Sequence, residues 1–391
     1  MTADHTMDDH TTVQRGSTSW EQARQLAHVA GLPVGAESVA LGDALGRVLA
    51  AAVTALVDLP GVDTIAMDGW AVCGAGPWVV VGASPAGAPA VTLNEGQAVE
   101  VATGSQCPAG ATGVVRAEEG QQRSGQLIGR SRSSDVRPRG EQCRAGQSVL
   151  PAGRVLRPPA LGLAAAVGVD RLEVLRRPRV AAVILGDEVI DAGLPAAGQV
   201  RDAIGPQLAG WVHELGGDIV GRCAVPDDLD STTAALAGWD QQVEVVVVTG
   251  GTSVGRGDHL RPALGAQGGV ALVDGVEVRP GHPMLLYRLP SGTLVIGLPG
   301  NPLAAVVALV TLLWPLLDGF LGRELPTLPT CSAQVAIPAA GTALVPCTVV
   351  EGQIAPVAHA GSAMLRGVAG AAGLAVADAG GGVRWLAFPW S

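Results

Sequence analysis

The residues best suited to chemistry follow a run of valines near the middle of the chain. Residues 243–259 read VEVVVVTGGTSVGRGDH, in which a β-branched run ends at Thr249 and opens into a glycine-rich loop. A continuous apolar run is typical of a strand buried on both faces of a parallel sheet. Glycines let backbone N–H groups turn outward and approach a ligand closely. The stretch therefore predicts a ligand-binding loop beyond the strand's carboxyl end, with Gly250, Gly251, Ser253 and Gly255 in the loop. A strand-to-helix loop without a ligand is the alternative.

Acidic side chains follow three of the predicted strands. Asp187 and Glu188 come after one strand, Asp227 and Asp228 after another, and Asp258 after the glycine-rich loop. A single acidic residue in such a place is usually a helix N-cap. Three strand ends of a parallel sheet would bring these carboxylates to one edge. Because Mg²⁺ usually binds one or two carboxylates plus substrate phosphates and water, the pattern indicates a Mg²⁺ and phosphate site there.

A second loop, GLPGNP at residues 297–302, comes just before an apolar helix. Asn301 suits the N-cap and Pro302 the first helical position. A helix start holds unpaired N–H donors and a partial positive charge, so Gly300 and Asn301 are predicted to lie at an anion site. Neither glycine-rich loop is followed by the lysine that a Walker loop requires, and no G-x-G-x-x-G motif follows a predicted strand. Phosphates are therefore expected to be bound by backbone amides, arginine and metal.

Alternating strands and helices are expected to position these loops. The predicted strands cover 179–185, 218–225 and 272–278, a helix covers 203–215, and a hairpin covers 284–296. This spacing implies a central, doubly wound α/β domain over residues 179–325. The longest apolar run, 303–317, is too short to span a bilayer and contains Pro315, so it is interpreted as a buried helix.

Smaller domains flank the α/β domain, which makes the predicted fold class α/β multidomain. After a disordered tail at 1–16, we expect a helical linker domain (17–55 plus 150–178), a small β domain (56–149) and a C-terminal β domain (326–391). A capping-box pattern from Thr18 to Glu21 predicts a helix to Ala30, and further helices are predicted at 44–51 and 161–167.

Polar turns of the small β domain add candidate site residues. The Met-Asp-Gly step places Asp68 on an exposed loop. Arg137 and Arg139 lie in another turn-rich stretch, where a solvated charge cluster is the alternative to a binding role.

Composition narrows the class of partner. The 391 residues have a formal charge of −10 and a pI near 5.1, which argues against nucleic acid or an anionic membrane as partner. Aromatic residues at 3% leave few stacking platforms for bases. The cysteines form no CxxC pair and are expected to be reduced thiols, and no signal peptide is evident, so a cytoplasmic protein is expected. All the basic residues are arginines, because the sequence contains no lysine.

Eight segments, in this order, resemble the molybdopterin molybdenumtransferase family, the bacterial MoeA proteins and the E domain of gephyrin. They are DTIAMDGWAV (63–72), VATGSQCPAGATGVV (101–115), VRPRGEQ (136–142), GDEV (186–189), PDDLD (226–230), TGGTSVGRGDH (249–259), VRPGHP (278–283) and GLPGNP (297–302). The resemblance implies four domains and an elongated homodimer with a substrate site shared between subunits. It also implies the reaction: adenylated molybdopterin is bound, molybdate is inserted at the dithiolene, and AMP is released with Mg²⁺. The molybdopterin adenylyltransferase is a further expected partner.

Matching positions carry the family's site residues onto this sequence. The resemblance implies catalytic roles for Asp68, Glu188, Asp227 and Asp258, with Glu188 and Asp258 as metal ligands. It implies substrate-binding roles for Thr103, Arg137, Arg139, Gly250, Gly251, Ser253, Gly255, Arg279, His282, Gly300, Asn301 and Ser362.

The departures from the family pattern concentrate at the oxyanion end of the site. Arg279 and His282 stand where the family's KPGKP stretch has lysines, Gly275 where some members have lysine, and Ala304 where a serine usually follows GNP. Arg and Lys are not equivalent, and His is charged only part of the time near neutral pH. Gln142 replaces a common Asp, and Thr342 lies near an expected Arg.

Two alternatives follow from these departures. A degenerate paralogue would bind the pterin or a partner without transferring metal. An unrelated α/β nucleotide hydrolase would share only the central domain, and it leaves the AMDG and GLPGNP segments unexplained. Molybdate and tungstate are both compatible with the sequence.

Overall fold

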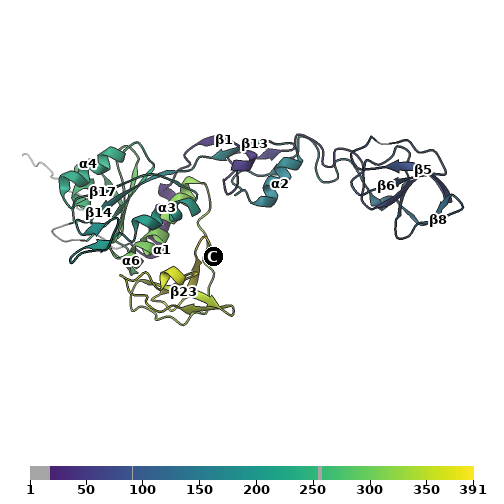
Figure 1. Ribbon diagram of the computed structural model, residues 1–391. Coiled ribbons are helices and arrows are strands. Elements are labelled where there is room, and N and C mark those ends of the chain that lie inside the picture. The colour runs from purple at the N-terminus through teal and green to yellow at the C-terminus, as the bar shows by residue number, and fades with distance from the viewer. Residues whose placement is uncertain (1–17, 90, 254–257) are drawn as a thin grey trace, which may run out of the picture. The chain divides into compact units, whose positions relative to one another are not determined.

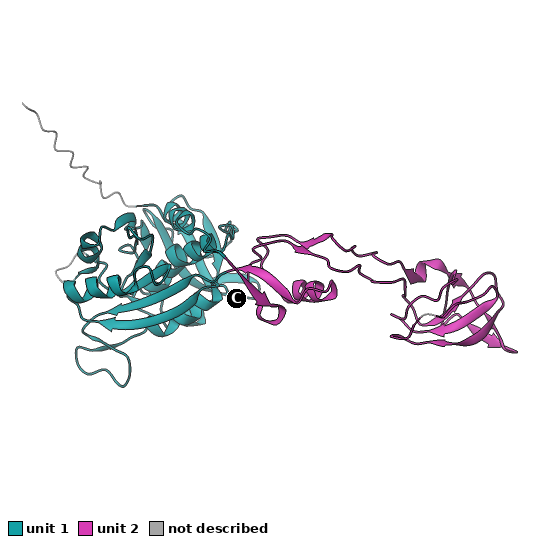
Figure 2. Ribbon diagram, turned by 90° about the horizontal axis from the view of Figure 1, so that it is seen from above, with its two compact units in different colours: residues 1–35, 176–391 teal, residues 36–175 magenta. Residues whose placement is uncertain are grey.

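The computed structural model describes residues 18–89, 91–253 and 258–391, which form two compact units (Figures 1 and 2). Unit 1 comprises Met1–Gly35 and Arg176–Ser391, and unit 2 comprises Ala36–Leu175. The predicted tail at 1–16 and the loop residue Gly255 lie outside the described residues.

Unit 1 is built on a mixed sheet of six strands. In spatial order these are β17 (Asp218–Val225), β14 (Arg179–Leu185), β18 (Val245–Thr249), β22 (Leu294–Leu298), β21 (Leu285–Arg288) and β19 (Val270–Asp274). The first four are parallel, and β21 is antiparallel to both of its neighbours. The predicted hairpin is confirmed as β21–β22. The single strand predicted over 272–278 is wrong, because it ends at Asp274, before Gly275 turns the chain with φ 90°.

Helices cover both faces of this sheet, and the valine run of β18 shows why. Val245 and Val247 belong to the core that includes α1 (Trp20–Ala30), α3 (Gly205–Glu214) and α6 (Pro302–Ala308). Val246 and Val248 belong to the opposite core, with α4 (Leu229–Trp239) and α5 (Leu260–Ala266). Successive side chains of a strand point to opposite faces, so an unbroken apolar run fits a doubly wound arrangement.

A long apolar helix fills the first of these cores. It consists of α6, a π-helical turn over Leu309–Leu313, and α7 (Trp314–Phe320). The wide turn ends at Leu313, two residues before Pro315, which lacks the N–H that an ordinary α-helical turn would use. Pro302–Phe320 is long and apolar enough to cross a membrane, but 94% of its apolar window is buried inside the protein. The predicted buried helix is confirmed.

The first helix, α1, differs from the prediction in its N-cap residue and in the part of the protein against which it packs. Its N-cap is Ser19, whose hydroxyl accepts from Gln22 N, one residue after the predicted capping box. The domain division drawn from the sequence groups residues 17–55 together, whereas α1 packs in unit 1. Trp20, Ala23 and Ala27 are fully buried there, and the Trp20 indole donates to Thr311 Oγ1 at 2.9 Å.

A small sheet at the end of the chain completes unit 1. It contains β20 (Val278–Arg279), β23 (Thr342–Val350), β25 (Gly373–Asp378) and β26 (Val383–Ala387), with β24 (Gln353–Pro356) paired to β23. A 3₁₀ turn, η4, spans Val368–Gly370. Because β20 comes from the α/β segment and pairs with β23, this sheet is joined to the α/β core by backbone hydrogen bonds.

Unit 2 contains a curled sheet of seven strands and a smaller helical part. The sheet runs in the order β10 (Ser131–Arg132), β7 (Gly113–Arg116), β4 (Gly69–Val72), β6 (Gln97–Val101), β5 (Trp78–Ser84), β9 (Gln126–Ile128), β8 (Gln121–Arg123). Three two-stranded pairs are β1 (Ala36–Ala40) with β13 (Arg171–Leu175), β2 (Val53–Thr54) with β12 (Ser148–Leu150), and β3 (Thr64–Ile65) with β11 (Val136–Arg137).

The helical content of unit 2 is lower than predicted. Helix α2 (Pro158–Ala166) confirms the helix expected at 161–167. The helix expected at 44–51 is wrong: a 3₁₀ turn, η1, spans Leu41–Asp43, and Gly46 then adopts φ 75°, outside the right-handed helical region. Val48 and Leu49 form isolated β-bridges instead. A second 3₁₀ turn, η2, spans Ser133–Asp135.

Candidate functional site

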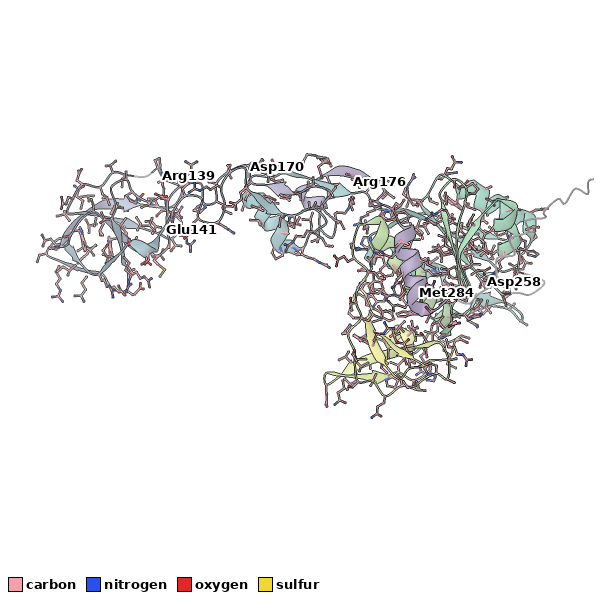
Figure 3. The ribbon with its side chains drawn as sticks, turned by 180° about the vertical axis from the view of Figure 1, so that it is seen from behind. Arg139, Glu141, Asp170, Arg176, Asp258 and Met284 are labelled. Atoms are coloured by element: carbon pink, nitrogen blue, oxygen red, sulfur yellow. The ribbon has the colours of Figure 1, made fainter. Side chains whose placement is uncertain are left out.

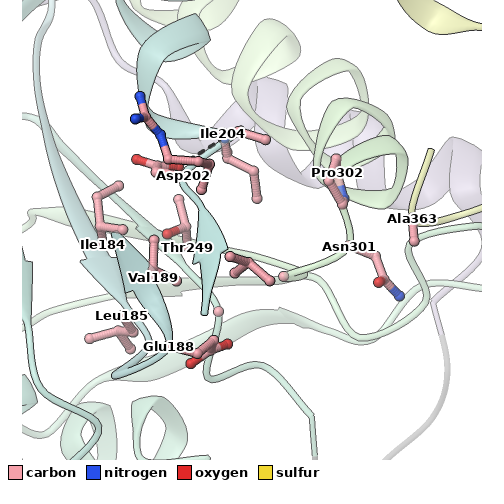
Figure 4. A pocket seen from close by; sticks show the side chains of 15 residues that line it. Ile184, Leu185, Glu188, Val189, Asp202, Ile204, Thr249, Asn301, Pro302 and Ala363 are labelled. Atoms are coloured by element: carbon pink, nitrogen blue, oxygen red, sulfur yellow. Dashed lines mark hydrogen bonds between the residues drawn. The ribbon is translucent and has the colours of Figure 1, made fainter. Parts of the chain in front are cut away.

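A cavity of about 580 Å³ lies at the carboxyl ends of the parallel strands of unit 1 (Figure 4). We refer to it as the strand-end cavity. Its lining comes from the ends of β14 and β18, the β15–β16 pair (Val189–Ile190 and Val200–Arg201), the start of α6 and the C-terminal segment. The lining residues are Ile184, Leu185, Glu188, Val189, Val200, Arg201, Asp202, Ala203, Ile204, Thr249, Gly250, Gly300, Asn301, Pro302 and Ala363.

The glycine-rich loop after β18 enters the cavity through Gly250. Gly250 and Gly251 adopt φ 83° and 65°, the left-handed region that favours glycine. The Gly250 N–H donates to Leu298 O at 2.9 Å, so this amide is already bonded within the protein. Ser253 N donates to Asp258 Oδ1 at 3.0 Å, so Asp258 also binds the loop that precedes it.

Arg261, which is not among the site residues predicted from the sequence, forms hydrogen bonds to the same loop. Arg261 Nη1 donates to Thr252 O at 2.5 Å and to Ser253 O at 3.1 Å, while its Nε donates to Asp274 Oδ1 at 2.8 Å. Tyr287 OH donates to the other oxygen of Asp274 at 3.0 Å. These hydrogen bonds connect the loop backbone to Asp274 through Arg261. The spacing of residues in the sequence does not reveal this role of Arg261.

The start of α6 is not the open anion site that the sequence predicted. Asn301 is the N-cap and Pro302 begins the helix, as expected, but the Asn301 side chain makes no capping bond. The next two amides are already satisfied, because Leu303 N and Ala304 N donate to Ser362 O at 3.0 and 3.4 Å. Ser362 thus contributes a backbone carbonyl to this helix start. Gly300 and Asn301 still line the cavity.

Three acidic residues gather beside the cavity. Asp227 N donates to Asp187 Oδ1 at 3.2 Å, and Glu188 lines the cavity itself. Partial burial raises the pKa of Asp227, and the neighbouring Glu188 raises it further. Asp228, the next residue, is a helix cap: it accepts from Ser231 N at 2.7 Å, which lowers its pKa. The two adjacent residues therefore differ in role: Asp228 caps a helix, and Asp227 belongs to the group of acidic side chains beside the cavity.

These carboxylates suit a hard cation, but only together with other ligands. Among the described residues, no group of three or more His, Cys, Asp or Glu side chains is placed to hold a metal ion on its own. Crowding of Asp227 by Glu188 and Asp187 is electrostatically unfavourable, and a nearby cation would relieve it. One carboxylate of this group, with Glu188 on the cavity lining as the first choice, therefore fits a Mg²⁺ ion that takes its remaining ligands from phosphate and water.

Arg201 brings a positive charge to the cavity, and no sequence motif marked it. Its Nη1 donates to Gly193 O at 2.8 Å, which leaves further guanidinium donors. The adjacent Asp202 is already engaged: its Oδ1 accepts from Ile204 N and Gly205 N at 2.9 and 2.8 Å, and its Oδ2 from Arg222 at 2.6 Å. Among the described lining residues, Arg201 is the one cationic side chain.

A separate pocket of about 450 Å³ contains the predicted oxyanion residues. It is lined by Glu277, Val278, Arg279, His282, Ala340 and Gly341, and we refer to it as the Arg279 pocket. His282 Nδ1 lies 2.7 Å from Val276 O, and since a carbonyl only accepts, Nδ1 carries the proton. The neutral ring therefore has a lone pair on Nε2. Gly275 lies beside this ring and adopts φ 90°, a conformation that disfavours a lysine there.

The remaining predicted residues belong to unit 2 and form two local groups. Asp68 Oδ1 accepts from both Thr103 N at 2.7 Å and Thr103 Oγ1 at 2.9 Å. These two bonds lower the pKa of Asp68, the backbone bond most. The structure thus brings Asp68 and Thr103 together, as the predicted site requires, and gives Asp68 a role in joining two turns.

The second group in unit 2 surrounds Arg139, which Figure 3 labels near Glu141. Arg139 N donates to Asp63 Oδ1 at 2.7 Å, and its Nε to Asp58 Oδ2 at 2.5 Å. Arg137 is exposed on β11, opposite Thr64. Arg139 therefore belongs to an exposed group of charges with defined partners, which is compatible with both a solvated charge cluster and a binding role.

Comparisons with known protein sequences cover most of the chain. Residues 18–168 match the family described as "MoeA N-terminal region (domain I and II)", and residues 181–319 match "Probable molybdopterin binding domain". A molybdopterin molybdenumtransferase of Synechococcus elongatus is 35% identical over 75% of this chain and 77% of its own length. Molybdopterin molybdenumtransferase 2 of Mycobacterium tuberculosis is 33% identical over 76% of this chain and 78% of its own.

The solved structures agree in fold. The molybdopterin biosynthesis MoeA protein of Pyrococcus horikoshii superposes with a TM-score of 0.79 over 95% of this chain and 98% of that one, at 21% identity.

Proposed function

This chain belongs to the molybdopterin molybdenumtransferase family, and we propose that it inserts molybdate into adenylated molybdopterin with Mg²⁺-dependent release of AMP. It is an enzyme of molybdenum cofactor biosynthesis of the molybdopterin molybdenumtransferase class.

The observation that carries the proposal is the strand-end cavity. Its volume of about 580 Å³ is in the range of small-molecule sites, and its lining includes both Arg201 and Glu188, the neighbour of Asp227. Ligands of open α/β sheets bind outside the carboxyl ends of the strands, which is where this cavity lies. We assign the phosphates of adenylated molybdopterin to this cavity, with Arg201 as the protein's positively charged contact.

Mg²⁺ would be held by the phosphates together with Glu188 and Asp258, the ligands that the family resemblance implies, and the charge of Asp227 beside Glu188 would add to the attraction. Bound there, it would neutralise charge on the phosphates as AMP leaves. The residues of the chain do the positioning. Arg261 holds the glycine-rich loop in place through Thr252 and Ser253. Asp258, at the end of that loop, is proposed to act on the same phosphates, as the family resemblance implies.

We assign molybdate to the Arg279 pocket. Arg279 can grip an oxyanion in a bidentate way, and His282 can add a donor from Nε2 when the ring is protonated. A homodimer, with Asp68, Thr103, Arg137 and Arg139 contributing across subunits, is part of the proposal, as are a cytoplasmic location and delivery of substrate by an adenylyltransferase.

The direct test is turnover of adenylated molybdopterin by the purified protein. With molybdate and Mg²⁺, AMP and molybdenum-loaded cofactor should form in equal amounts, and the product should activate a cofactor-free molybdoenzyme. A degenerate paralogue would bind the adenylated substrate and form neither product. That result would reject the proposed reaction.

A further inference from the structure

A second cavity of unit 1 adjoins the strand-end cavity. It has a volume of about 470 Å³ and lies along α3, and Ala203 lines both cavities. The two also draw on neighbouring residues of the same segments, with Pro302 and Ala363 in the first and Val306 and Leu365 in the second. A single extended ligand could therefore occupy both.

Aromatic rings form one wall of this second cavity. Trp211 of α3 meets Phe388 and Trp390 at centroid distances of 5.6 and 4.6 Å, and Phe388 meets Trp390 at 5.2 Å. Trp211 and Phe388 are almost fully buried, whereas Trp390 is 51% exposed. Because aromatic residues make up only 3% of the chain, three in one cavity are a marked concentration.

The exposed tryptophan is held in place although it is the penultimate residue. Phe388 N donates to Ala372 O at 2.9 Å, Ser391 N to Phe388 O at 3.1 Å, and the Ser391 hydroxyl to Ala372 O at 2.6 Å. A ring fixed in this way is a preorganised platform, so a ligand that stacks on it loses little entropy in ordering it.

The polar groups of the cavity suit a base rather than a phosphate. Gln207, Trp211 and Glu214 have the spacing of one helical face. Gln207 is engaged by Trp211 Nε1 at 3.2 Å and by its own bond to Ala203 O at 2.7 Å. The exposed Glu214 carboxylate repels anions but accepts hydrogen bonds from amino groups.

We propose that this cavity binds the adenine base of adenylated molybdopterin, and we refer to it as the base cavity. The inference rests on the proposed function, since a nucleotide joined to a pterin through phosphates needs a place beside the phosphate site. Arg201 lies two residues before Ala203, so phosphates near Arg201 would lead a ribose and base toward Trp390. The base stacks on Trp390, and its amino group faces Glu214.

The test compares AMP with ribose 5-phosphate by calorimetry on the full-length protein. Both carry the phosphate, but only AMP carries the base. Wild type should bind AMP at least about 10-fold more tightly, because base stacking on an aromatic side chain is worth that much. Trp390→Ala should reduce AMP affinity to that of ribose 5-phosphate, with ribose 5-phosphate unaffected.

A second variant blocks the base cavity without touching the aromatic cluster. A Cβ placed on Gly210 meets no atom within 4 Å, and Gly210 lies within α3, so Gly210→Leu should fill the cavity and favour the helix. It should also remove the preference for AMP. Val270→Ala, an exposed apolar site on the edge strand β19, is the control and should keep it.

The outcomes separate this inference from the proposed function. A preference for AMP that persists in folded Trp390→Ala and Gly210→Leu, or that is absent in wild type, overturns the base cavity while turnover of adenylated molybdopterin still stands. A preference that depends on Trp390 in a protein without turnover keeps the base cavity and rejects the proposed reaction.

Discussion

Asp68 in unit 2 and Asp227 in unit 1 are both acidic residues of short polar turns, yet their surroundings differ in kind. Asp68 accepts two hydrogen bonds from Thr103, and these bonds lower its pKa. Asp227 is partly buried beside Glu188 and Asp187, and its pKa is raised. Hydrogen-bond donors favour the charged form, whereas burial and like charges oppose it.

The difference separates two uses of a carboxylate. The surroundings of Asp68 stabilise its charge already, so it contributes to the folded state as it stands. The charge of Asp227 is opposed by its neighbours, so the site gains most when a cation arrives. Perturbed carboxylates of the second kind are the ones expected at functional sites.

The largest expected effect is a loss of AMP release on substitution of Asp258, which lies in unit 1 as Asp227 does. Asp258→Asn should lower Mg²⁺-dependent AMP release by about 100-fold, the scale on which loss of one electrostatic contact acts in a transition state. An Asn oxygen can still accept from Ser253 N, so the melting temperature should stay the same. The rate is measured by AMP formation, with Asp218→Asn, at the amino end of β17, as the matched control. Unchanged AMP release in Asp258→Asn would remove it from the site.

A second effect concerns the Arg279 pocket, where protonation of His282 should control molybdate binding. Because Nδ1 is committed to Val276 O, protonation occurs on Nε2 and turns an acceptor into a charged donor. Molybdate affinity should be about 10-fold higher at pH 5.5 than at pH 8, since the protonated ring adds a charge-assisted hydrogen bond to the oxyanion. Calorimetry at both pH values tests this. His282→Lys should bind equally at both, and equal affinities in the parent would make His282 structural.

A smaller effect concerns the cause of the raised pKa of Asp227. In the metal-free protein, Glu188→Gln removes a neighbouring negative charge, so Asp227 should titrate at lower pH than in the parent. Carboxyl NMR of the two proteins measures this shift directly. An unaltered titration would mean that burial alone sets the pKa, and that the carboxylates do not act as a cluster.

The smallest effect is on stability, where the two regions should respond with opposite signs. The folded pKa of Asp227 is raised, so stability falls as pH rises through the window above its ordinary value, and Asp227→Asn should raise stability at neutral pH. Because Asp227 is partly exposed, the gain should stay below about 1 kcal/mol.

The folded pKa of Asp68 is lowered, so its contribution is present at neutral pH and lost on acidification through that folded pKa. Asp68→Ala should lower the melting temperature at neutral pH, whereas Asp68→Asn retains an acceptor for Thr103. Loss of activity in a stable Asp68→Asn would show the chemical role implied by the family resemblance. Melting curves that move the same way in Asp227→Asn and Asp68→Ala would contradict the comparison.

The sequence predicts the fold well where a local pattern decides the structure. The unbroken valines of β18 indicate a strand buried on both faces, and Pro315 in an apolar run indicates a buried helix, and both are observed. Prediction fails where distant contacts decide. The α6 amides are taken by Ser362 O, and the helix expected at 44–51 gives way to β-bridges with Val155 and Val174.

The site shows the same division. Glu188, Gly250, Gly300 and Asn301 are predicted from motifs and do line the strand-end cavity. Arg201 has no motif, because only the pairing of β15 with β16 brings it to the cavity. Gly275 adopts a positive φ, which a lysine in its place would adopt less readily. Ala304 is buried, with its amide bonded to Ser362, and nothing in this arrangement explains the lost serine.

The most direct measurement of the central claim is the Mg²⁺ concentration that half-saturates AMP release in wild type, Asp227→Asn and Asp218→Asn. Each variant removes one negative charge. Asp227 follows the carboxyl end of β17, whereas Asp218 is the first residue of that strand. If Asp227 and its neighbouring carboxylates attract Mg²⁺, Asp227→Asn should need at least about 10-fold more Mg²⁺ for half-saturation than wild type. Asp218→Asn should need the same concentration as wild type. Equal Mg²⁺ requirements in all three proteins would contradict the account.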